Sequence, residues 1–306
     1  MHAGFAGSVP GVRRLLVTGA SGVLGWNVCA AARDAWRTFG IVHRHRIDLP
    51  GVSRAICDLT GAASIERLVE EIAPDAIIHC AAAASPDYCQ SHADESRRIN
   101  VETASGLAGV CARGPIPFVF VSTDLVFDGT RPPYRECDPV SPISVYGDQK
   151  ATAEHAVLER NPDAVVCRLP PIFGDPGPAS TSFIQPWMEA LRGGWTLRLF
   201  TDEIRTPVGA GTAATGLLMA LGAGGGILHL GGRERISRYD LGIVLAEVLG
   251  ADVRLVTPGR QRDRTAGAPR PADVSLDSAC AYRLGYDPPS LRDEMTLLLR
   301  DPGQIR

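Results

Sequence analysis

The stretch Leu15-Leu16-Val17-Thr18-Gly19-Ala20-Ser21-Gly22-Val23-Leu24-Gly25 decides the fold. Its first four residues form an apolar run typical of a buried strand, and a helical pattern begins at Val23 and continues to Trp36. Glycines between the two permit a tight turn, close approach of backbone N–H groups to a pyrophosphate, and close helix packing. The helix N-terminus also favours an anion. A glycine-rich turn without function is the alternative interpretation. The predicted dinucleotide contacts are Gly19, Ser21, Gly22, Val23, Leu24 and Gly25.

The first half of the chain repeats this alternation of short apolar runs and helical patterns. Such alternation predicts βαβ units and a parallel sheet that is covered on both faces. We therefore predict an α/β fold, a Rossmann-type doubly wound parallel sheet with a smaller C-terminal substrate-binding lobe. Further strands are expected at residues 40–43, 76–80, 118–122 and 164–168, and further helices at residues 64–72, 94–112 and 144–159.

The pattern loosens after Gly174 into segments rich in glycine and proline. Helices are expected there near residues 210–221, 238–249 and 291–299. We predict an NAD(P)-binding Rossmann domain over residues 12–174, to which later segments return. Residues 175–306 are expected to form mainly the substrate-binding lobe.

Composition excludes several classes of function. The chain has 306 residues, of which 45% are hydrophobic and 21% charged, as in an ordinary soluble globular protein. A net charge of -3 does not indicate binding to nucleic acid or to an anionic membrane, which usually requires an excess of positive charge. No apolar run approaches the ~20 residues of a membrane span, and the N-terminus lacks a signal-peptide pattern. The eight cysteines are scattered without zinc spacing. We expect a cytoplasmic protein without a metal site.

The second strand is followed by His43-Arg44-His45-Arg46. An NAD site usually has an acid here that binds the ribose hydroxyls, whereas a basic residue accommodates a 2′-phosphate. Arg44 therefore predicts NADPH rather than NADH, unless these side chains simply face solvent. Asp58 and Leu59 follow the third strand, where Asp58 could accept the adenine amino group. An exposed turn aspartate is the alternative for Asp58.

The pentapeptide Tyr146-Gly147-Asp148-Gln149-Lys150 contains the only lysine of the chain, beside thirty arginines. Positions i and i+4 share a helix face, so the ammonium of Lys150 can approach the phenol oxygen of Tyr146. A neighbouring cation favours the phenolate and moves the pKa of tyrosine from ~10 toward neutrality. We predict that Tyr146 is a proton donor and that Lys150 tunes it. The alternative is a packed tyrosine and a solvated lysine.

These motifs resemble, in order and over nearly the whole chain, the extended short-chain dehydrogenase/reductases. The resemblance includes the glycine-rich loop, His79-Cys80-Ala81-Ala82, Ser122-Thr123-Asp124 and the Tyr146/Lys150 pair. Within that family, residues 122–130 and 142–147 are most similar to dTDP-4-dehydrorhamnose reductases. The resemblance implies hydride transfer from a nicotinamide to a ketone carbon. Tyr146 would then give the proton, Thr123 would bond the carbonyl oxygen, and Lys150 would also reach the nicotinamide ribose.

The resemblance also suggests contacts around the reacting groups. The small residues Cys80, Ala81, Ala82 and Ala83 would let the cofactor approach the strand end, although tight helix packing explains them equally well. Asn100 matches a family asparagine, or it bonds nearby backbone.

Substrate contacts are expected from Ser85 and Asp124. Arg205 or Arg270 could hold a pyrophosphate bidentately, unless they are surface salt-bridge residues. Pro171 stands where the rhamnose-forming reductases carry an aromatic residue, which changes the wall that faces the sugar.

The leading hypothesis is an NADPH-dependent reductase of a nucleotide-linked 4-keto-6-deoxysugar, acting on a CH–OH/C=O group and possible as a homodimer. A second hypothesis is a non-catalytic NADP-binding subunit. Residues 126–130, 132–136 and 168–174 also resemble the regulatory beta subunit of methionine adenosyltransferase. A third is a nucleotide-sugar epimerase on the same fold. A dehydratase would want an acidic pair near Thr123, where only Asp124 is present.

Overall fold

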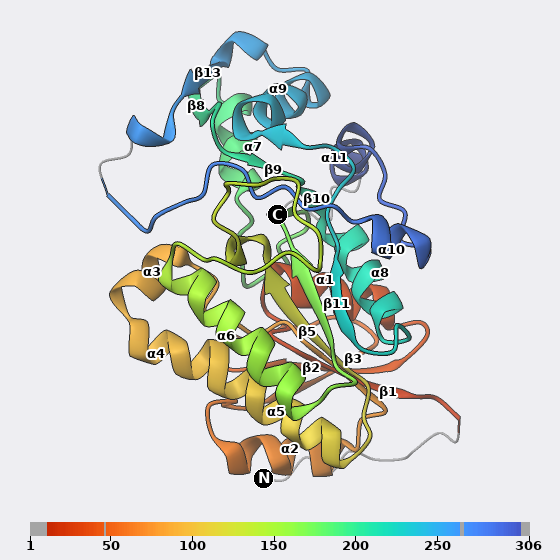
Figure 1. Ribbon diagram of the computed structural model, residues 1–306. Coiled ribbons are helices and arrows are strands. Elements are labelled where there is room, and N and C mark those ends of the chain that lie inside the picture. The colour runs from red at the N-terminus through yellow and green to blue at the C-terminus, as the bar shows by residue number, and fades with distance from the viewer. Residues whose placement is uncertain (1–10, 46, 264–265, 301–306) are drawn as a thin grey trace.

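The computed structural model describes residues 11–45, 47–263 and 266–300 (Figure 1). These residues contain a seven-stranded parallel sheet with the order β11-β6-β5-β4-β1-β2-β3. Helices cover both of its faces, so the predicted Rossmann-type α/β class is confirmed. The strands are β1 (Arg14–Thr18), β2 (Arg37–Val42), β3 (Val52–Ile56), β4 (Ala76–His79), β5 (Phe118–Thr123), β6 (Val165–Leu169) and β11 (Gly226–His229).

Two apolar layers hold the helices to the sheet. On one face, α1 (Val23–Ala32) and α8 (Ala210–Ala220) pack together over a core that includes Val17 and Leu217. On the other face, α2 (Ala62–Ile72), α5 (Thr103–Arg113) and α6 (Val145–Arg160) pack over Phe120 and Leu107. Burial on both faces explains why the strand sequences are continuously apolar rather than alternating.

Two helices differ from the sequence prediction. The helix expected over residues 23–36 ends at Ala32, because a turn then leads into β2, which begins at Arg37. The helix expected over residues 94–112 is divided into α4 (Ala93–Arg97), a π-helical segment (Arg98–Glu102) and α5, preceded by α3 (Pro86–Ser91). The hydrophobic periodicity of a sequence does not reveal the extra residue of a π turn, so the sequence predicted one continuous helix.

The second lobe has its own core, in which α7 (Ile184–Arg192), α9 (Arg238–Leu249) and α11 (Leu291–Arg300) pack together. Short strands pair there as β8 (Leu197–Phe200) with β13 (Val256–Gly259), β7 (Ile172–Phe173) with β10 (Val208–Gly209), and β9 (Ile204–Arg205) with β12 (Ile236–Ser237). Short 3-10 helices lie at Asp124–Val126, Val253–Leu255 and Gln261–Asp263.

Figure 1 shows this lobe beyond the carboxyl ends of the sheet strands. Between its elements the chain returns to the sheet through α8 and β11, next to which α10 (Ala279–Arg283) lies. A domain boundary between residues 174 and 175 stays a prediction. No helix in the described part of the chain is both long enough and apolar enough to span a membrane.

The strand order changes direction at β1. The chain runs from β1 outward to β2 and β3 on one side, and then to β4, β5 and β6 on the other. In such sheets, the loops at the carboxyl ends of the strands separate at this point, and ligands bind in the crevice between them. The topology therefore predicts a binding site between the ends of β1 and β4.

Candidate functional site

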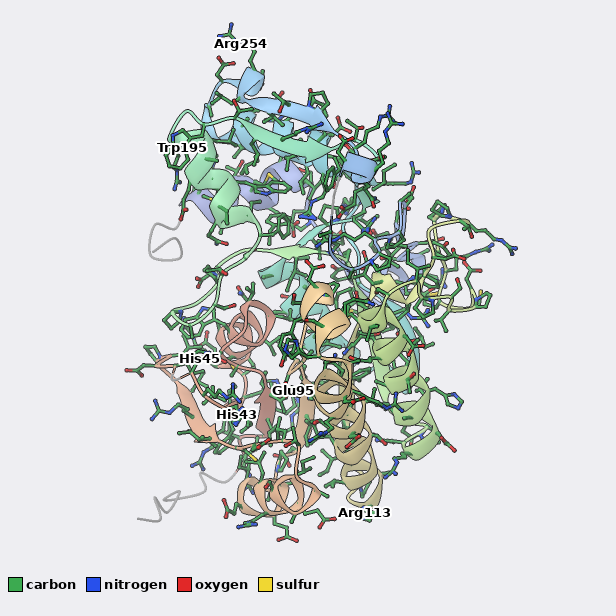
Figure 2. All side chains as sticks on the ribbon, turned by 90° about the vertical axis from the view of Figure 1, so that its left-hand side faces the viewer. His43, His45, Glu95, Arg113, Trp195 and Arg254 are labelled. Carbon is green, nitrogen blue, oxygen red and sulfur yellow. The ribbon has the colours of Figure 1, made fainter. Side chains whose placement is uncertain are left out.

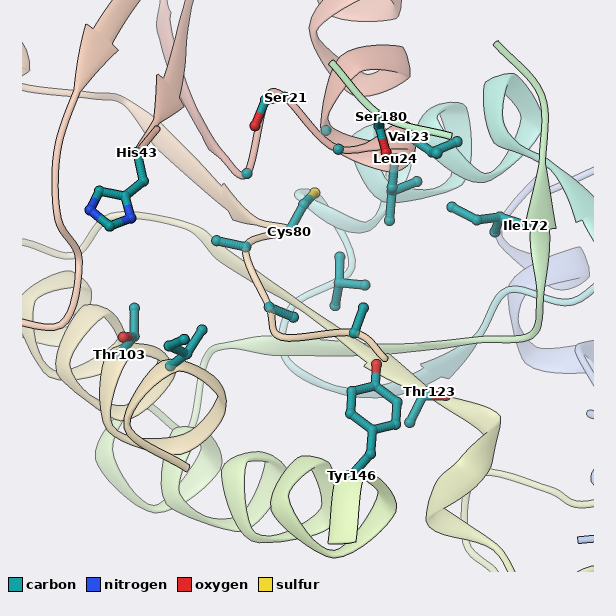
Figure 3. Close-up of a pocket in the computed structure, with 18 of the residues that line it drawn as sticks. Ser21, Val23, Leu24, His43, Cys80, Thr103, Thr123, Tyr146, Ile172 and Ser180 are labelled. Atoms are coloured by element: carbon teal, nitrogen blue, oxygen red, sulfur yellow. The ribbon is translucent and has the colours of Figure 1, made fainter. Parts of the chain in front are cut away.

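A cavity of about 980 Å³ lies at this point of the fold (Figure 3). Its walls come from the loop between β1 and α1, the ends of β2, β4 and β5, and the start of α6. Residues 169–172 and 179–183 form the wall on the side of the second lobe. The following residues predicted as site residues line it: Gly19, Ser21, Gly22, Val23, Leu24, Gly25, Arg44, Asp58, Leu59, Cys80, Ala81, Ala82, Thr123, Asp124, Tyr146 and Lys150.

The turn before α1 requires glycine for steric reasons. Gly19 has φ +67°, and a Cβ added there would lie 2.7 Å from the backbone of Ala81. A Cβ at Gly25 would lie 2.2 Å from the carbonyl oxygen of Gly19. Gly22 occupies the N-cap of α1 without a side-chain capping bond. The first N–H groups of α1 are therefore available to an anion in the cavity.

The far end of the cavity is exposed and carries basic side chains together with the acids Asp58 and Glu95. His43, Arg44 and His45 follow β2, and Figure 2 shows His43, His45 and Glu95 on the same side of the molecule. Asp58 accepts hydrogen bonds from the N–H (3.0 Å) and hydroxyl (2.7 Å) of Thr60, which lower the pKa of its carboxyl. Arg46 lies outside the described residues.

The centre of the cavity holds two hydroxyl groups. Figure 3 shows the Tyr146 hydroxyl pointing from the first turn of α6 into the cavity, with Thr123 beside it at the end of β5. Ser144 caps α6 by accepting the N–H of Gly147 (3.1 Å). A Cβ at Gly147 would lie 2.2 Å from the Leu125 carbonyl oxygen, so glycine lets α6 pack directly on the turn after β5. This contact brings Tyr146 next to Thr123.

The predicted lowering of the Tyr146 pKa is wrong. Burial raises the pKa of Tyr146 above its usual range, because the phenolate would lose its hydration, and the thiol of Cys89 and the carboxyl of Asp124 act in the same direction. The Lys150 ammonium instead donates a 2.6 Å hydrogen bond to the Val121 carbonyl and lies 4.1 Å from the centroid of the Phe120 ring. Tyr146 is therefore a protonated phenol at neutral pH.

Lys150 is 2% exposed, so the alternative of a solvated lysine is also wrong. Burial lowers the pKa of Lys150 to about 7, and the negative charge of Glu154 opposes this effect. A lysine with this pKa changes its protonation state near neutral pH.

Asp124 is a buried carboxyl beside the two hydroxyl groups. Its Oδ1 accepts the Thr123 hydroxyl at 3.1 Å, and its Oδ2 lies 3.5 Å from Nε of Arg205. Burial raises the pKa of Asp124 to about 6, although the Arg205 guanidinium opposes this. Arg205 does not line the main cavity, and at 4% exposure it is not a surface residue either. Its guanidinium donates to the carbonyls of Ile204, Ala272 and Pro271.

Four other predicted residues lie outside the cavity wall. Ser85 caps α3, where its hydroxyl accepts the N–H of Tyr88. Ala83 donates its N–H to Oδ1 of Asn100 (2.8 Å) and accepts from Nδ2 (3.2 Å), so Asn100 does bond backbone. Arg270 lies 3.9 Å from the carboxylate of Asp87. Ligand contacts by Ser85, Ala83, Arg205 and Arg270 stay predictions.

The sequence prediction missed part of the wall. Residues 179–183 line the cavity, together with Tyr88, Glu95, Arg98 and Thr103. Segment 175–183 is anchored across the molecule, where Asp175 accepts the indole N–H of Trp26 at 2.7 Å. Composition marked this segment as a loop, but no local pattern indicates which distant helix it contacts. Among the described residues, no group of three or more His, Cys, Asp and Glu side chains could hold a metal ion.

Residues 13–302 match the protein family described as RmlD substrate binding domain. The chain belongs to this family. One relative of this RmlD-family chain is the probable low-salt glycan biosynthesis reductase Agl14 of Haloferax volcanii, 35% identical over 289 residues that cover 92% of this chain and 96% of the relative. Another is the methionine adenosyltransferase 2 subunit beta of Xenopus tropicalis, 30% identical over 293 residues that cover 91% and 84%.

The RmlD-family fold also appears in solved structures. A dTDP-4-dehydrorhamnose reductase from Bacillus anthracis, in complex with NADP, superimposes with a TM-score of 0.84. The match covers 94% of this chain and 99% of the other at 22% identity, so it shows a common fold. The resemblances noted in the sequence, to the reductases and to the beta subunit, are thereby confirmed.

Proposed function

We propose that this RmlD-family protein is an NADPH-dependent reductase that acts on the keto group of a nucleotide-linked 4-keto-6-deoxysugar. The observation that carries the proposal is the placement of the Tyr146 hydroxyl and Thr123 in one cavity with the glycine-rich turn before α1. The Haloferax relative, named as a probable glycan biosynthesis reductase, supports a sugar substrate. Assembly as a homodimer and a cytoplasmic location remain predictions.

The residues around the cavity fit a dinucleotide. At Gly19 and Gly25 a Cβ would clash with the backbone of Ala81 and Gly19, so the tight turn needs glycine, and Gly22 leaves the N-terminus of α1 without a side-chain cap. This arrangement suits a pyrophosphate, and Arg44 at the far end suits a 2′-phosphate. A volume of about 980 Å³ is at the upper end of ordinary ligand pockets, as expected where cofactor and substrate bind together. When bound, the nicotinamide supplies the hydride.

The side chains of this protein supply the proton and orient the carbonyl. Tyr146 is protonated at neutral pH, which is the form that reduction requires. Its high pKa does not prevent transfer, because the acceptor is a developing alkoxide, a much stronger base than a phenolate. Thr123 accepts the N–H of Leu125 (3.2 Å) and donates to Asp124. Rotation of its hydroxyl hydrogen from Asp124 to the substrate orients the carbonyl oxygen next to Tyr146.

The test of this proposal is a spectrophotometric assay with two candidate sugars. The absorbance of NADPH is followed while the protein is mixed with dTDP-4-keto-6-deoxyglucose or its epimerised derivative. We expect NADPH to be consumed in proportion to the sugar added, because each ketone takes one hydride. If NADPH bound to the protein but was not consumed with either sugar, the proposed activity would be contradicted.

Arg44 at the exposed end of the cavity predicts the choice of cofactor. Replacing Arg44 by Ala should weaken NADPH binding about fivefold, as expected for an exposed charge pair, and leave NADH binding unchanged. Arg113→Ala is the matched control, since Arg113 is also exposed but pairs with Glu66 away from the cavity (Figure 2). Dissociation constants are measured by the fluorescence of the reduced cofactors. Equal constants for NADH and NADPH in the wild type would rule out this role of Arg44.

A non-catalytic role is the second candidate. It is supported by the 30% identity with the methionine adenosyltransferase 2 subunit beta of Xenopus tropicalis. This chain is similar to that subunit over 91% of its length, so the integrity of the cavity does not distinguish the two candidates. Co-purification with a methionine adenosyltransferase, together with no reductase activity, would favour this alternative.

A further inference from the structure

A buried ion pair lies behind the cavity, next to the residues that the proposed reaction uses. Glu154 on α6 and Arg168 on β6 are 4% and 2% exposed, and neither lines the cavity. The Glu154 carboxylate accepts Nη2 of Arg168 at 2.7 Å and Nε at 3.0 Å. It also accepts the Ser122 hydroxyl at 2.5 Å. Ser122 and Arg168 face each other in the β5–β6 register, so two strands hold one carboxylate.

Helix α6 places the Glu154 carboxylate on the same face as the two site residues Tyr146 and Lys150. Tyr146, Lys150 and Glu154 are spaced by four residues on α6 and therefore share one face. Lys150 is attached to β5 through the Val121 carbonyl, and Glu154 is attached to the next residue, Ser122. The two side chains are thus fixed one helical turn apart by adjacent residues of the same strand.

Glu154 is also the charged neighbour of Lys150. The other titratable groups that face the lysine are Cys80 after β4, Cys89 on α3 and His79 on β4. Burial raises the pKa of both thiols and lowers the pKa of His79 to about 3, so all three are neutral at pH 7. Tyr146 is protonated as well. Arg168 is charged, but it is paired with Glu154 on the side away from the cavity.

We propose that Glu154, held by Ser122 and Arg168, is a positioning residue that favours the charged form of Lys150, whose ammonium is bonded to the Val121 carbonyl one turn from Tyr146. Pairing with Arg168 is essential to this role, because an unpaired carboxyl at this depth would take up a proton and lose its charge. The role of Glu154 in catalysis rests on the proposed function, whereas its effect on the charge of Lys150 does not.

The single lysine makes the charge state directly measurable. Protein labelled with ¹³C at the lysine Cε gives one lysine signal, whose chemical shift follows the protonation of Lys150. In the wild type, we expect a titration midpoint near the pKa of about 7. In Glu154→Gln, the midpoint should fall by roughly one unit, as expected on loss of an opposite charge one helical turn away.

A control on the same helix separates this effect from a general change of charge. Glu159→Gln removes the same charge from an exposed position in the last turn of α6, and it should leave the midpoint unchanged. An unchanged midpoint in folded Glu154→Gln would overturn the proposal.

Glu154→Gln leaves Arg168 without its carboxylate and could fail to fold. The double variant Glu154→Gln/Arg168→Met removes both charges, a replacement that buried ion pairs often tolerate. Its midpoint should still lie below that of the wild type, but by less than in the single variant, because the repulsion by Arg168 is also gone. A midpoint at or above the wild-type value would overturn the proposal. The titration uses neither cofactor nor sugar, so its outcome is independent of the reductase assay.

Discussion

Replacing Tyr146 by Phe should lower the rate of ketone reduction by about 10²–10⁴-fold, the usual contribution of a general acid. The Tyr146 hydroxyl points into the cavity beside Thr123, and phenylalanine keeps the ring but removes the proton. The ring is buried and α6 is capped by Ser144, so the helix should remain in place. We therefore expect NADPH affinity to stay within about twofold of wild type, since the contacts of the glycine-rich turn are unchanged.

The measurement is steady-state kinetics with a saturating keto sugar, together with cofactor titration of each variant. Tyr282→Phe is the matched control, because Tyr282 on α10 is 39% exposed and lies outside the cavity. It should retain the wild-type rate. If Tyr146→Phe also retained it, Tyr146 would not be the proton donor, and a different group in the cavity would have to supply the proton.

The Tyr146/Lys150 pair shows what spacing can and cannot predict. Spacing of four residues correctly indicated that both side chains lie on one face of a helix and reach one cavity. It gave no information on how deeply the two side chains are buried. At 8% and 2% exposure, the cost of removing charge from water dominates the pKa values of Tyr146 and Lys150. The predicted effect of the lysine on the tyrosine failed for this reason.

Arg205 shows a second limit of the sequence. Its charge suggested either a pyrophosphate ligand or a surface salt bridge, and in the structure it is buried beside Asp124. Two of its other partners are the carbonyl groups of residues 271 and 272, which lie more than sixty positions away along the chain. Residues 179–183 reached the cavity in a similar way, through a contact between Asp175 and Trp26. Long-range contacts of this kind leave no periodic pattern in the sequence.

The glycine-rich turn is the opposite case, because local sequence predicted both its position and its shape. Steric requirements there are short in range. The loop joins a strand to a helix within five residues, and the carbonyl oxygen of Gly19 faces the first turn of the helix that contains Gly25. Glycine is therefore required at position 25 by a contact that forms within the motif itself. This makes Gly25 a sharp test of the cofactor site.

Replacing Gly25 by Ala should destabilise the protein by about 2–3 kcal/mol, the usual cost of overpacking a site that cannot relax freely. The new Cβ would lie 2.2 Å from the carbonyl oxygen of Gly19, which is backbone and not the end of a flexible side chain. Helix α1 is packed against β1 and α8, so it cannot move away without breaking that core. The turn must shift instead, and NADPH affinity should fall at least about tenfold, which corresponds to ~1.4 kcal/mol.

Gly211→Ala provides the comparison, since Gly211 lies in the first turn of α8 and a Cβ there would meet nothing within 4 Å. Alanine is a better helix former than glycine by up to ~1 kcal/mol, so this variant should be neutral or slightly more stable. Thermal unfolding and cofactor titration are measured for both variants. The two substitutions are chemically identical, so opposite effects on stability reflect the different surroundings of the two glycines, chiefly the close contact of position 25 with the Gly19 carbonyl oxygen. Equal stability and equal NADPH affinity in the two variants would show that the turn before α1 does not bind the cofactor as proposed.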